Sequence, residues 1–398
     1  MDKICVGDYV IGNEEKKAVN NVLDSGRISE GKCVKEFEKQ FAEIIGRKYC
    51  TLVNSGTSAL IAGLTALLYD DRYPNIKKGS KVIVSPVTYV ATVNAIKLVE
   101  MEPVFVDINP ITFDIIPYQI ESALKLDKDI SIILPVHLMG YACNMELINK
   151  IADKYNVVVF EDSAQAHGTK YKGKNTGSMS LLADFSFYIA HNIQVGEMGA
   201  VVTDDKKINS LVKKIKTNGR MCECSVCTRL DGNCKHKDDD YDHRFKHDMI
   251  GYNFKTMEFQ ASLGLVQLNK FNDIINRRKE IVKYLNDGLI GVNDLVTLPT
   301  RTDDTNFLGY PLILNKKCIR TYVCRELEKL NIETRPLFGC IPTQQPAYSE
   351  YKEKYKDILP NADYVGNNAF YVGCHQYLTD DQLDYMIDSI KSVLCKLR

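Results

Sequence analysis

The chain has 398 residues, which is enough for two or three domains and for a core that buries most of its apolar surface. Lys+Arg and Asp+Glu each total 51, so the zero net charge predicts neither a nucleic-acid nor a membrane partner held by bulk charge. The first residues are too polar for a signal peptide, and no apolar run approaches the length of a membrane span. We therefore expect a cytoplasmic protein.

Short apolar runs alternate with helical patterns over the first half of the chain. Helical spacing is present at 13–24 and 33–45, and the run 51–69 predicts a strand, a turn and a helix. The later runs continue this alternation and are, in order, 81–86, 88–99, 102–108, 131–140, 144–156, 157–166 and 199–205. β-Branched runs separated by helices predict an α/β fold with a mostly parallel sheet covered on both faces.

The pattern changes after about residue 205 and predicts a second, smaller domain. A very polar segment at about 219–250 is typical of a surface excursion, and 253–268 has helical spacing. A long helix over 271–289 then leads into an α+β module, built from 305–314, 320–330, 332–336 and a final helix over 381–397. We predict a large domain over 1–265, which includes the excursion, and a small domain over 266–398.

Two motifs follow predicted strands, at the edge where α/β sheets bind ligands. In NSGTSAL, Gly56 and Thr57 begin a helix, whose free backbone N–H groups and nearby hydroxyls either bind a phosphate or simply form a capped helix start. In FEDSAQAHG, Asp162 ends an apolar strand. A carboxylate there suits a protonated pyridine nitrogen, although it could equally cap a helix.

These motifs, with DFSFYIAHNIQVGEMGAVVTDD, GYNFKTMEFQASLGLVQL and TRPLFGCIPTQQPAY in this order, resemble the DegT/StrS sugar aminotransferases. The resemblance covers nearly the whole chain and implies the fold of fold-type I pyridoxal-phosphate enzymes. It also implies cofactor-binding roles for a set of residues. Gly56, Thr57 and Ser186 would hold the phosphate, Tyr89 would stack on the ring, Asp162 would pair with the pyridine nitrogen, Gln165 would lie beside the ring hydroxyl, and Asn253 would reach the phosphate in the other subunit of a homodimer.

One position departs from the aminotransferase pattern. His191 stands where those enzymes carry the lysine that binds the cofactor covalently. An imidazole cannot hold the cofactor in that way, but it can act as a base. The same exchange is found in the 3-dehydratases of nucleotide-linked 4-keto-6-deoxy sugars, which this sequence also resembles. That resemblance implies non-covalent pyridoxamine 5'-phosphate (PMP) and a catalytic role for His191.

Four of the 13 cysteines are clustered in the polar excursion, namely Cys222, Cys224, Cys227 and Cys234. The segment resembles the iron–sulfur segment of the CDP-sugar 3-dehydratase group of the ascarylose pathway, in which a partner reductase supplies electrons. That group takes one cluster ligand from the position of Ala164, so the four local cysteines would have to bind a cluster by themselves. They could instead bind structural zinc or remain reduced thiols.

The sequence therefore predicts a PMP-dependent dehydratase that removes the C3 hydroxyl of a nucleotide-linked 4-keto-6-deoxyhexose in deoxysugar and surface-polysaccharide synthesis. Electrons would come through an iron–sulfur cluster and a flavin or iron–sulfur reductase. Three alternatives remain: a cluster-free dehydratase regenerated by glutamate, an aminotransferase, and a catalytically silent binding protein of the same fold.

Overall fold

The computed structural model describes residues 2–224, 226–315 and 319–397. A seven-stranded sheet forms the centre of the large domain, in the strand order β1-β9-β8-β5-β4-β2-β3. Its strands are β1 (Tyr49–Val53), β2 (Lys81–Val84), β3 (Glu102–Phe105), β4 (Ile130–Leu134), β5 (Val158–Asp162), β8 (Leu182–Ser186) and β9 (Gly199–Thr203). β9 runs antiparallel to both β1 and β8, whereas β8, β5, β4, β2 and β3 are mutually parallel. The predicted mostly parallel sheet is confirmed.

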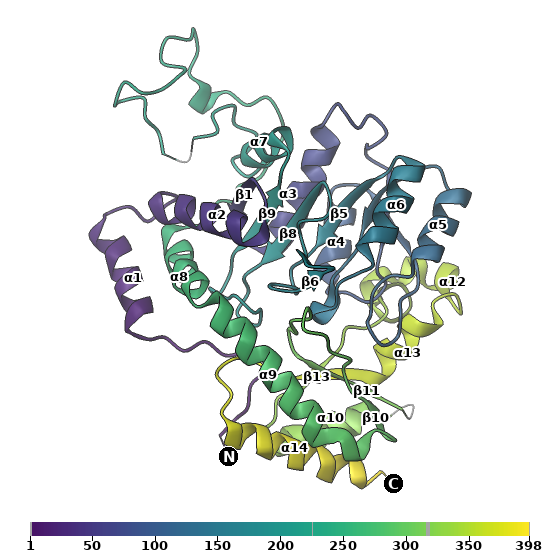
Figure 1. The fold of residues 1–398 in the computed structure, drawn as a ribbon. Coiled ribbons are helices and arrows are strands. Elements are labelled where there is room, and N and C mark those ends of the chain that lie inside the picture. Colours follow the sequence, from purple (N-terminus) through teal and green to yellow (C-terminus); the bar gives the residue numbers. More distant parts are fainter. Residues whose placement is uncertain (1, 225, 316–318, 398) are drawn as a thin grey trace.

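Helices cover both faces of this sheet (Figure 1). One layer contains α3 (Gly56–Tyr69), which packs against both α4 (Val90–Leu98) and α7 (Lys206–Ile215), while α5 (Pro117–Leu126) and α6 (Met145–Tyr155) form a pair that packs on β5 through α6. The other layer packs on β1, β8 and β9 and contains α2 (Lys32–Ile45) and α8 (Glu258–Asn269), while α1 (Asn13–Asp24) packs against α8. The helix predicted over 253–268 begins only at Glu258.

Helix α3 lies closest to the sheet and brings its N-terminus to the sheet edge. It is almost uniformly apolar, and its residues from Ala59 to Leu67 are buried, which is expected of a helix enclosed on all sides. A Cβ at Gly63 would lie 2.5 Å from Phe160 Cζ on β5, so glycine is required for this close packing. Tight contact between α3 and the sheet fixes where the first turn of the helix lies.

The second half of the chain contains a four-stranded sheet in the order β10-β11-β13-β12. Its elements are β10 (Val296–Thr297), β11 (Tyr310–Leu314), α10 (Arg320–Lys329), β12 (Arg335–Pro336), α11 (Ile341–Gln344), α12 (Lys352–Tyr355), α13 (Pro360–Asn368), β13 (Ala369–Val372) and α14 (Asp380–Cys395). The long helix α9 (Phe271–Leu289) runs from α8 to this region and packs against α14 (Figure 1). The predicted domain boundary at residue 265 falls inside α8, four residues before its end.

Several shorter elements lie between these helices and strands. The hairpin β6 (Lys170–Tyr171) and β7 (Lys174–Asn175) follows β5, and the 3-10 turn η2 (His243–Phe245) lies in the excursion. This excursion projects from the large domain beyond α7 (Figure 1), as its polarity predicts, and one of its residues, Ser225, lies outside the described ranges. Among the described helices, none is long and apolar enough to span a bilayer.

Candidate active site

A cavity of about 430 Å³ lies beyond the carboxyl ends of the parallel strands. Side chains from the small sheet, including Arg335 and Tyr371, close it on the other side. Seven of the eight residues that the sequence assigns to the cofactor or to catalysis line it. They are Gly56, Thr57, Tyr89, Asp162, Gln165, Ser186 and His191. The structure therefore brings together in one cavity residues that are up to 135 positions apart in the chain (56 to 191).

The N-terminus of α3 forms one end of the cavity. Ser55 caps the helix by accepting a hydrogen bond from the Ser58 amide at 3.1 Å, while the first-turn amides of Gly56 and Thr57 have no partner within the helix. A Cβ at Gly56 would lie 2.5 Å from Ser186 Cβ, so only glycine lets the helix start approach the Ser186 side chain this closely. This end of the cavity suits a phosphate group, because it combines free backbone amides, the positive end of the helix dipole and the Ser186 hydroxyl.

Asp162, at the end of β5, is held in a fixed orientation inside the cavity. One carboxyl oxygen accepts a hydrogen bond from the Thr92 hydroxyl at 2.8 Å, and the other accepts one from the Ala164 amide at 3.2 Å. Burial raises the pKa of Asp162, although the Thr92 hydrogen bond opposes this shift. A nearby cation would favour the charged carboxylate, so the site is suited to a protonated pyridine nitrogen.

A second carboxyl group, Asp184, lines the same cavity and was not predicted from the sequence. It pairs in register with Asp162 on the neighbouring parallel strand, and neither of its carboxyl oxygens has a hydrogen-bond partner among the described residues. Burial, reinforced by the negative charge of Asp162, raises the pKa of Asp184 well above its usual value. In the sequence, Asp184 is simply the first residue of the motif DFSFYIAHNIQVGEMGAVVTDD, and the parallel register is what brings it beside Asp162.

We expect Asp184→Asn to stabilise the cofactor-free protein more at pH 8 than at pH 5. A folded-state pKa above the unfolded value means that folding binds a proton, so the wild type loses stability as the pH rises from the unfolded pKa through the folded one. For each pH unit between the unfolded and the folded pKa, the wild type loses about 1.4 kcal/mol of unfolding free energy, and the variant does not. Urea denaturation at pH 5 and at pH 8 measures the unfolding free energy of each protein. The control Asp303→Asn replaces an exposed residue and should change that free energy equally at the two pH values. Equal effects of Asp184→Asn at the two pH values would contradict the prediction.

His191 lies at the edge of the cavity, after β8. Its surroundings hold the imidazole in its neutral form, because burial, with a smaller contribution from the buried guanidinium of Arg278, lowers its pKa to about 4. The ring contacts Tyr188 on one side, with centroids 6.1 Å apart, and His167 on the other, 6.3 Å away. A neutral imidazole that opens on a cavity can accept a proton from a bound molecule.

His167 is a packing residue. Its ring is fully buried and stacks against Phe185 and Phe187, with a centroid distance of 5.4 Å in each case. Burial lowers the pKa of His167 well below the usual value, so His167 packs beside the His191 ring as an uncharged side chain.

The remaining lining residues define where a ring and a substrate could lie. The Gln165 side-chain carbonyl accepts a hydrogen bond from the Met139 amide at 3.0 Å, which fixes its orientation. Tyr89 is 58% exposed and contacts Phe338 of the small domain, with ring centroids 5.8 Å apart. Arg335 contributes a guanidinium that is held by Glu333 at 3.1 Å. Neither Phe338 nor Arg335 was predicted as a site residue, although both lie within the segment 334–348 that resembles the family.

Asn253 does not line the cavity of its own chain. It is exposed and forms an isolated antiparallel bridge with Thr217, beside the start of the excursion. This position leaves open the predicted role in the other subunit of a dimer, which stays a prediction.

The four clustered cysteines lie in the excursion with different exposures. Cys222 is buried, Cys234 is half-buried, and Cys224 and Cys227 are exposed. Burial raises the pKa of Cys224, and the neighbouring Cys222 and Cys234 thiols add to this shift. Cys227 lies 4.0 Å from the Arg244 guanidinium instead. Ala164, the position at which a related group supplies a cluster ligand, lines the active-site cavity.

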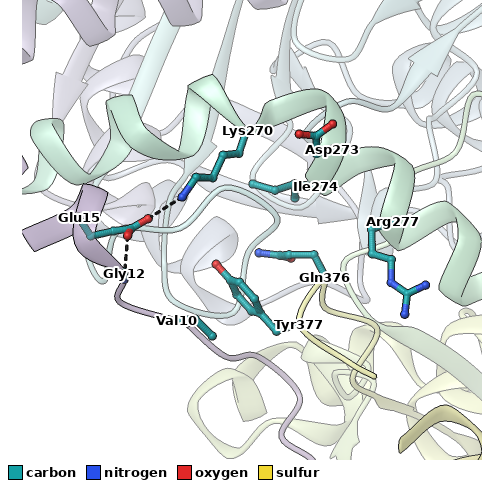
Figure 2. A pocket seen from close by; sticks show the side chains of 9 residues that line it. All are labelled: Val10, Gly12, Glu15, Lys270, Asp273, Ile274, Arg277, Gln376 and Tyr377. Atoms are coloured by element: carbon teal, nitrogen blue, oxygen red, sulfur yellow. Dashed lines mark hydrogen bonds and ion pairs between the residues drawn. The ribbon is translucent and has the colours of Figure 1, made fainter. Parts of the chain in front are cut away.

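A second cavity, of about 470 Å³, lies between the start of α9, the segment after β13 and the N-terminal arm, which is the segment 2–12 that leads into α1 (Figure 2). Its cations are already paired. Lys270 binds Glu15 at 3.0 Å, and Arg277 binds Asp380 at 2.8 Å. Glu15 also accepts the Gly12 amide at 2.8 Å, so this network ties the N-terminal arm to α9 rather than presenting free charge to a ligand.

A mostly parallel sheet covered by helices, with a small α+β domain closing a cavity at its carboxyl edge, is the fold of the fold-type I pyridoxal-phosphate-dependent transferases. Residues 10–391 match the model of the DegT/DnrJ/EryC1/StrS aminotransferase family, and the chain belongs to this family.

Individual relatives include enzymes with different names. The chain is 34% identical to GDP-perosamine synthase of Escherichia coli O157:H7, with 98% of each protein covered. It is 30% identical to dTDP-4-dehydro-2,6-dideoxy-D-glucose 3-dehydratase of Saccharopolyspora spinosa, over 97% of this chain and 86% of that protein. The structure of Escherichia coli GDP-4-keto-6-deoxy-D-mannose-3-dehydratase with hydrated PLP is similar, with a TM-score of 0.85 and 27% identity over 98% of this chain and 100% of the other.

Proposed function

We propose that this protein is a PMP-dependent dehydratase that removes the C3 hydroxyl of a nucleotide-linked 4-keto-6-deoxyhexose, with electrons supplied through an iron–sulfur cluster. The observation that carries the dehydratase assignment is the position of His191 in the cavity. It occupies the place of the aminotransferase lysine, and the described residues that line the cavity include no lysine. Without that lysine, no covalent link holds the cofactor, and the usual transamination cycle lacks its proton carrier.

The residues present fit PMP. The phosphate would bind at the start of α3, at the amides of Gly56 and Thr57 and the hydroxyl of Ser186. Two orphaned groups support the fit, because Asp184 and His191 Nδ1 have no hydrogen-bond partner among the described residues. When bound, the cofactor supplies an amine that condenses with a ketone and a ring that accepts electrons.

The chain then provides orientation and proton transfer. With the cofactor bound, Asp162 would keep its pyridine nitrogen protonated, and Tyr89 and Gln165 would hold its ring. His191 is neutral, so its imidazole could accept a proton from the bound molecule and then return it or deliver it to the leaving hydroxyl.

The substrate assignment rests on the relatives and on the lining of the cavity. A histidine-to-asparagine variant of GDP-4-keto-6-deoxymannose-3-dehydratase, whose structure is similar with a TM-score of 0.84 and 27% identity, contains bound GDP-perosamine. In this chain, Arg335, Phe338 and Tyr371 close the cavity opposite Asp162 and could contact such a ligand. The guanidinium of Arg335 suits a phosphate or carboxylate group.

We further propose that Cys222, Cys224, Cys227 and Cys234 bind the cluster. Thiolates are the ligands that iron–sulfur clusters require, and the four occur in one excursion that leads back through Asn253 toward the sheet edge. Burial and, to a smaller extent, the Cys222 and Cys234 thiols raise the pKa of Cys224, so this cysteine has two of the other three as neighbours. Reduction by a partner protein would then be needed for turnover.

The test is an absorption and EPR spectrum of protein purified without oxygen, before and after dithionite, with iron, sulfide and zinc analysis. We expect charge-transfer bands that bleach on reduction, and their loss in Cys222→Ser and Cys227→Ser variants. A control, Cys395→Ser, replaces an exposed cysteine outside the excursion and should keep the bands. Zinc without iron, together with turnover that needs only glutamate, would overturn the cluster assignment and leave the simpler dehydratase.

An aminotransferase is the second candidate, favoured by the 34% identity to GDP-perosamine synthase. It requires a lysine to reach the cofactor from outside the cavity lining. Borohydride treatment of the PLP-loaded protein distinguishes the two candidates, because only a covalently bound cofactor is trapped on the chain.

A further inference from the structure

Outside the cavity and the cysteine cluster, the excursion contains a second group of metal-ligating side chains. Nδ1 of His236, a carboxyl oxygen of Asp239 and Nε2 of His243 all lie within 4.8 Å of one another. The same oxygen of Asp239 is 2.9 Å from His236 Nδ1 and 2.5 Å from His243 Nε2. Both imidazoles therefore direct a nitrogen at one point beside a carboxylate.

The rings are arranged in a stack rather than spread in solvent. The centroids of His236 and His243 are 3.9 Å apart, with 24° between their planes, and Tyr241 lies on His243 at 4.5 Å. The Lys246 ammonium lies over the Tyr241 ring at 3.7 Å. His243 itself is buried, which is unusual in so polar a segment. This packing limits the rotation of the imidazoles, so less conformational entropy is lost when a ligand binds.

The backbone that carries the two histidines is also fixed. The Arg229 guanidinium donates to the carbonyl oxygens of His236 and Lys237, at 3.0 Å in each case. The carbonyl of His243 accepts the amide of Cys222 at 3.2 Å. The histidine–aspartate group is thus joined directly to the first of the clustered cysteines.

We propose that His236, Asp239 and His243 form a binding site for a divalent transition-metal ion of the Zn²⁺ type, separate from the four cysteines. Two imidazole nitrogens and one carboxylate oxygen are a ligand set that zinc accepts, with a fourth position for water. Imidazole ligands favour such ions over Mg²⁺ and Ca²⁺, which prefer oxygen. On binding, each imidazole takes the tautomer whose lone pair faces the metal, so the proton directed at Asp239 is replaced by one on the other ring nitrogen, by exchange with solvent. The rings separate slightly to admit the ion.

The site would brace the excursion. A bound ion would join residues 236, 239 and 243 into one rigid turn and, through the Cys222 amide, would fix one edge of the cysteine cluster. The proposal does not depend on the dehydratase assignment, because it requires neither PMP nor iron.

The experiment uses the full chain with Cys222, Cys224, Cys227 and Cys234 all replaced by serine, and circular dichroism verifies that it folds. Titration with Zn²⁺ followed by calorimetry should give one ion per chain. His236→Ala, Asp239→Asn or His243→Ala, each added to this background, should weaken Zn²⁺ binding at least tenfold. His247→Ala is the matched control and should leave Zn²⁺ binding unchanged, because His247 lies in the same excursion but its Nδ1 pairs with the Asn218 carbonyl, at 3.0 Å.

A structural readout separates a site from loose surface binding. Zn²⁺ should slow proteolysis within 226–250 at least fivefold in the cysteine-free chain and not in its Asp239→Asn derivative. If the serine variant does not fold, wild-type protein with alkylated thiols replaces it in both measurements. Absence of stoichiometric binding, or equal losses for His247→Ala and His236→Ala, would overturn the proposal.

Discussion

His191→Asn is expected to lower the rate of substrate dehydration by about 100- to 10,000-fold, while PMP still binds. The reason is that asparagine preserves the shape of the side chain but has no nitrogen that can accept a proton, and a positioned base typically contributes a factor of this size. The measurement is single-turnover loss of the 4-keto sugar on PMP-loaded protein without oxygen. PMP affinity, followed by cofactor fluorescence, should change less than threefold, because the phosphate and ring contacts involve other residues.

The matched comparison is His191→Lys, which restores the aminotransferase residue at the same place. We expect this variant to hold PLP covalently, with an absorption band that borohydride removes, and to exchange amino groups with glutamate. A His191→Asn protein that dehydrates at the wild-type rate would refute the role of His191 as the base. A His191→Lys protein that binds PLP only reversibly would show instead that the cavity cannot place a side-chain amine at the cofactor.

The neutral state of His191 explains why a histidine can serve here. Its pKa of about 4 follows from burial and not from a hydrogen-bonded carboxylate, so the imidazole is uncharged at physiological pH and is available as a base. A further buried histidine of the region, His137, has a different role. Its Nε2 lies 3.0 Å from Glu161, and its Nδ1 accepts the Cys143 amide at 3.0 Å, which ties β4 to β5 beneath the cavity.

The sequence predicted the fold and most of the cavity because strand-end motifs carry the functional side chains. Gly56, Asp162 and His191 each follow or end an apolar run, and the carboxyl ends of parallel strands meet at one edge. Asp184 was missed because its importance comes from register, since nothing near it in the chain indicates that it faces Asp162 across the strand pair. Arg335 was missed for a similar reason, because it enters the cavity from the other domain.

The excursion was predicted as a polar surface segment but its internal order was not. The close spacing of the four cysteines in the sequence favours them as one ligand set. His243 and His247 stand four positions apart, which in a helix would place them on one face. In the structure, His243 pairs with His236 through Asp239, while His247 points to the Asn218 carbonyl. The difference arises because 243–245 forms only a single 3-10 turn, so helical spacing does not apply there.

Asp162→Asn is expected to lower the dehydration rate by about 100-fold or more, with little effect on folding. Asparagine can keep both local hydrogen bonds, because its carbonyl can accept the Ala164 amide and its amide group can face Thr92 Oγ1. What it lacks is the negative charge that keeps a pyridine nitrogen protonated, and removing one such preorganised electrostatic contact typically costs 100- to 1,000-fold in rate.

Thr92→Val is the matched control for that experiment. It removes the hydroxyl that holds Asp162 at 2.8 Å but leaves the carboxylate in place, so we expect a loss of less than about tenfold. The bound-cofactor absorption spectrum, recorded from pH 6 to 9, gives a readout other than rate: the pyridine nitrogen should lose its proton at lower pH in Asp162→Asn than in Thr92→Val or the wild type. Equal spectra and equal rates for the two variants would mean that orientation, rather than charge, is what Asp162 provides. The fixed geometry of its two hydrogen bonds would then become the basis of its role.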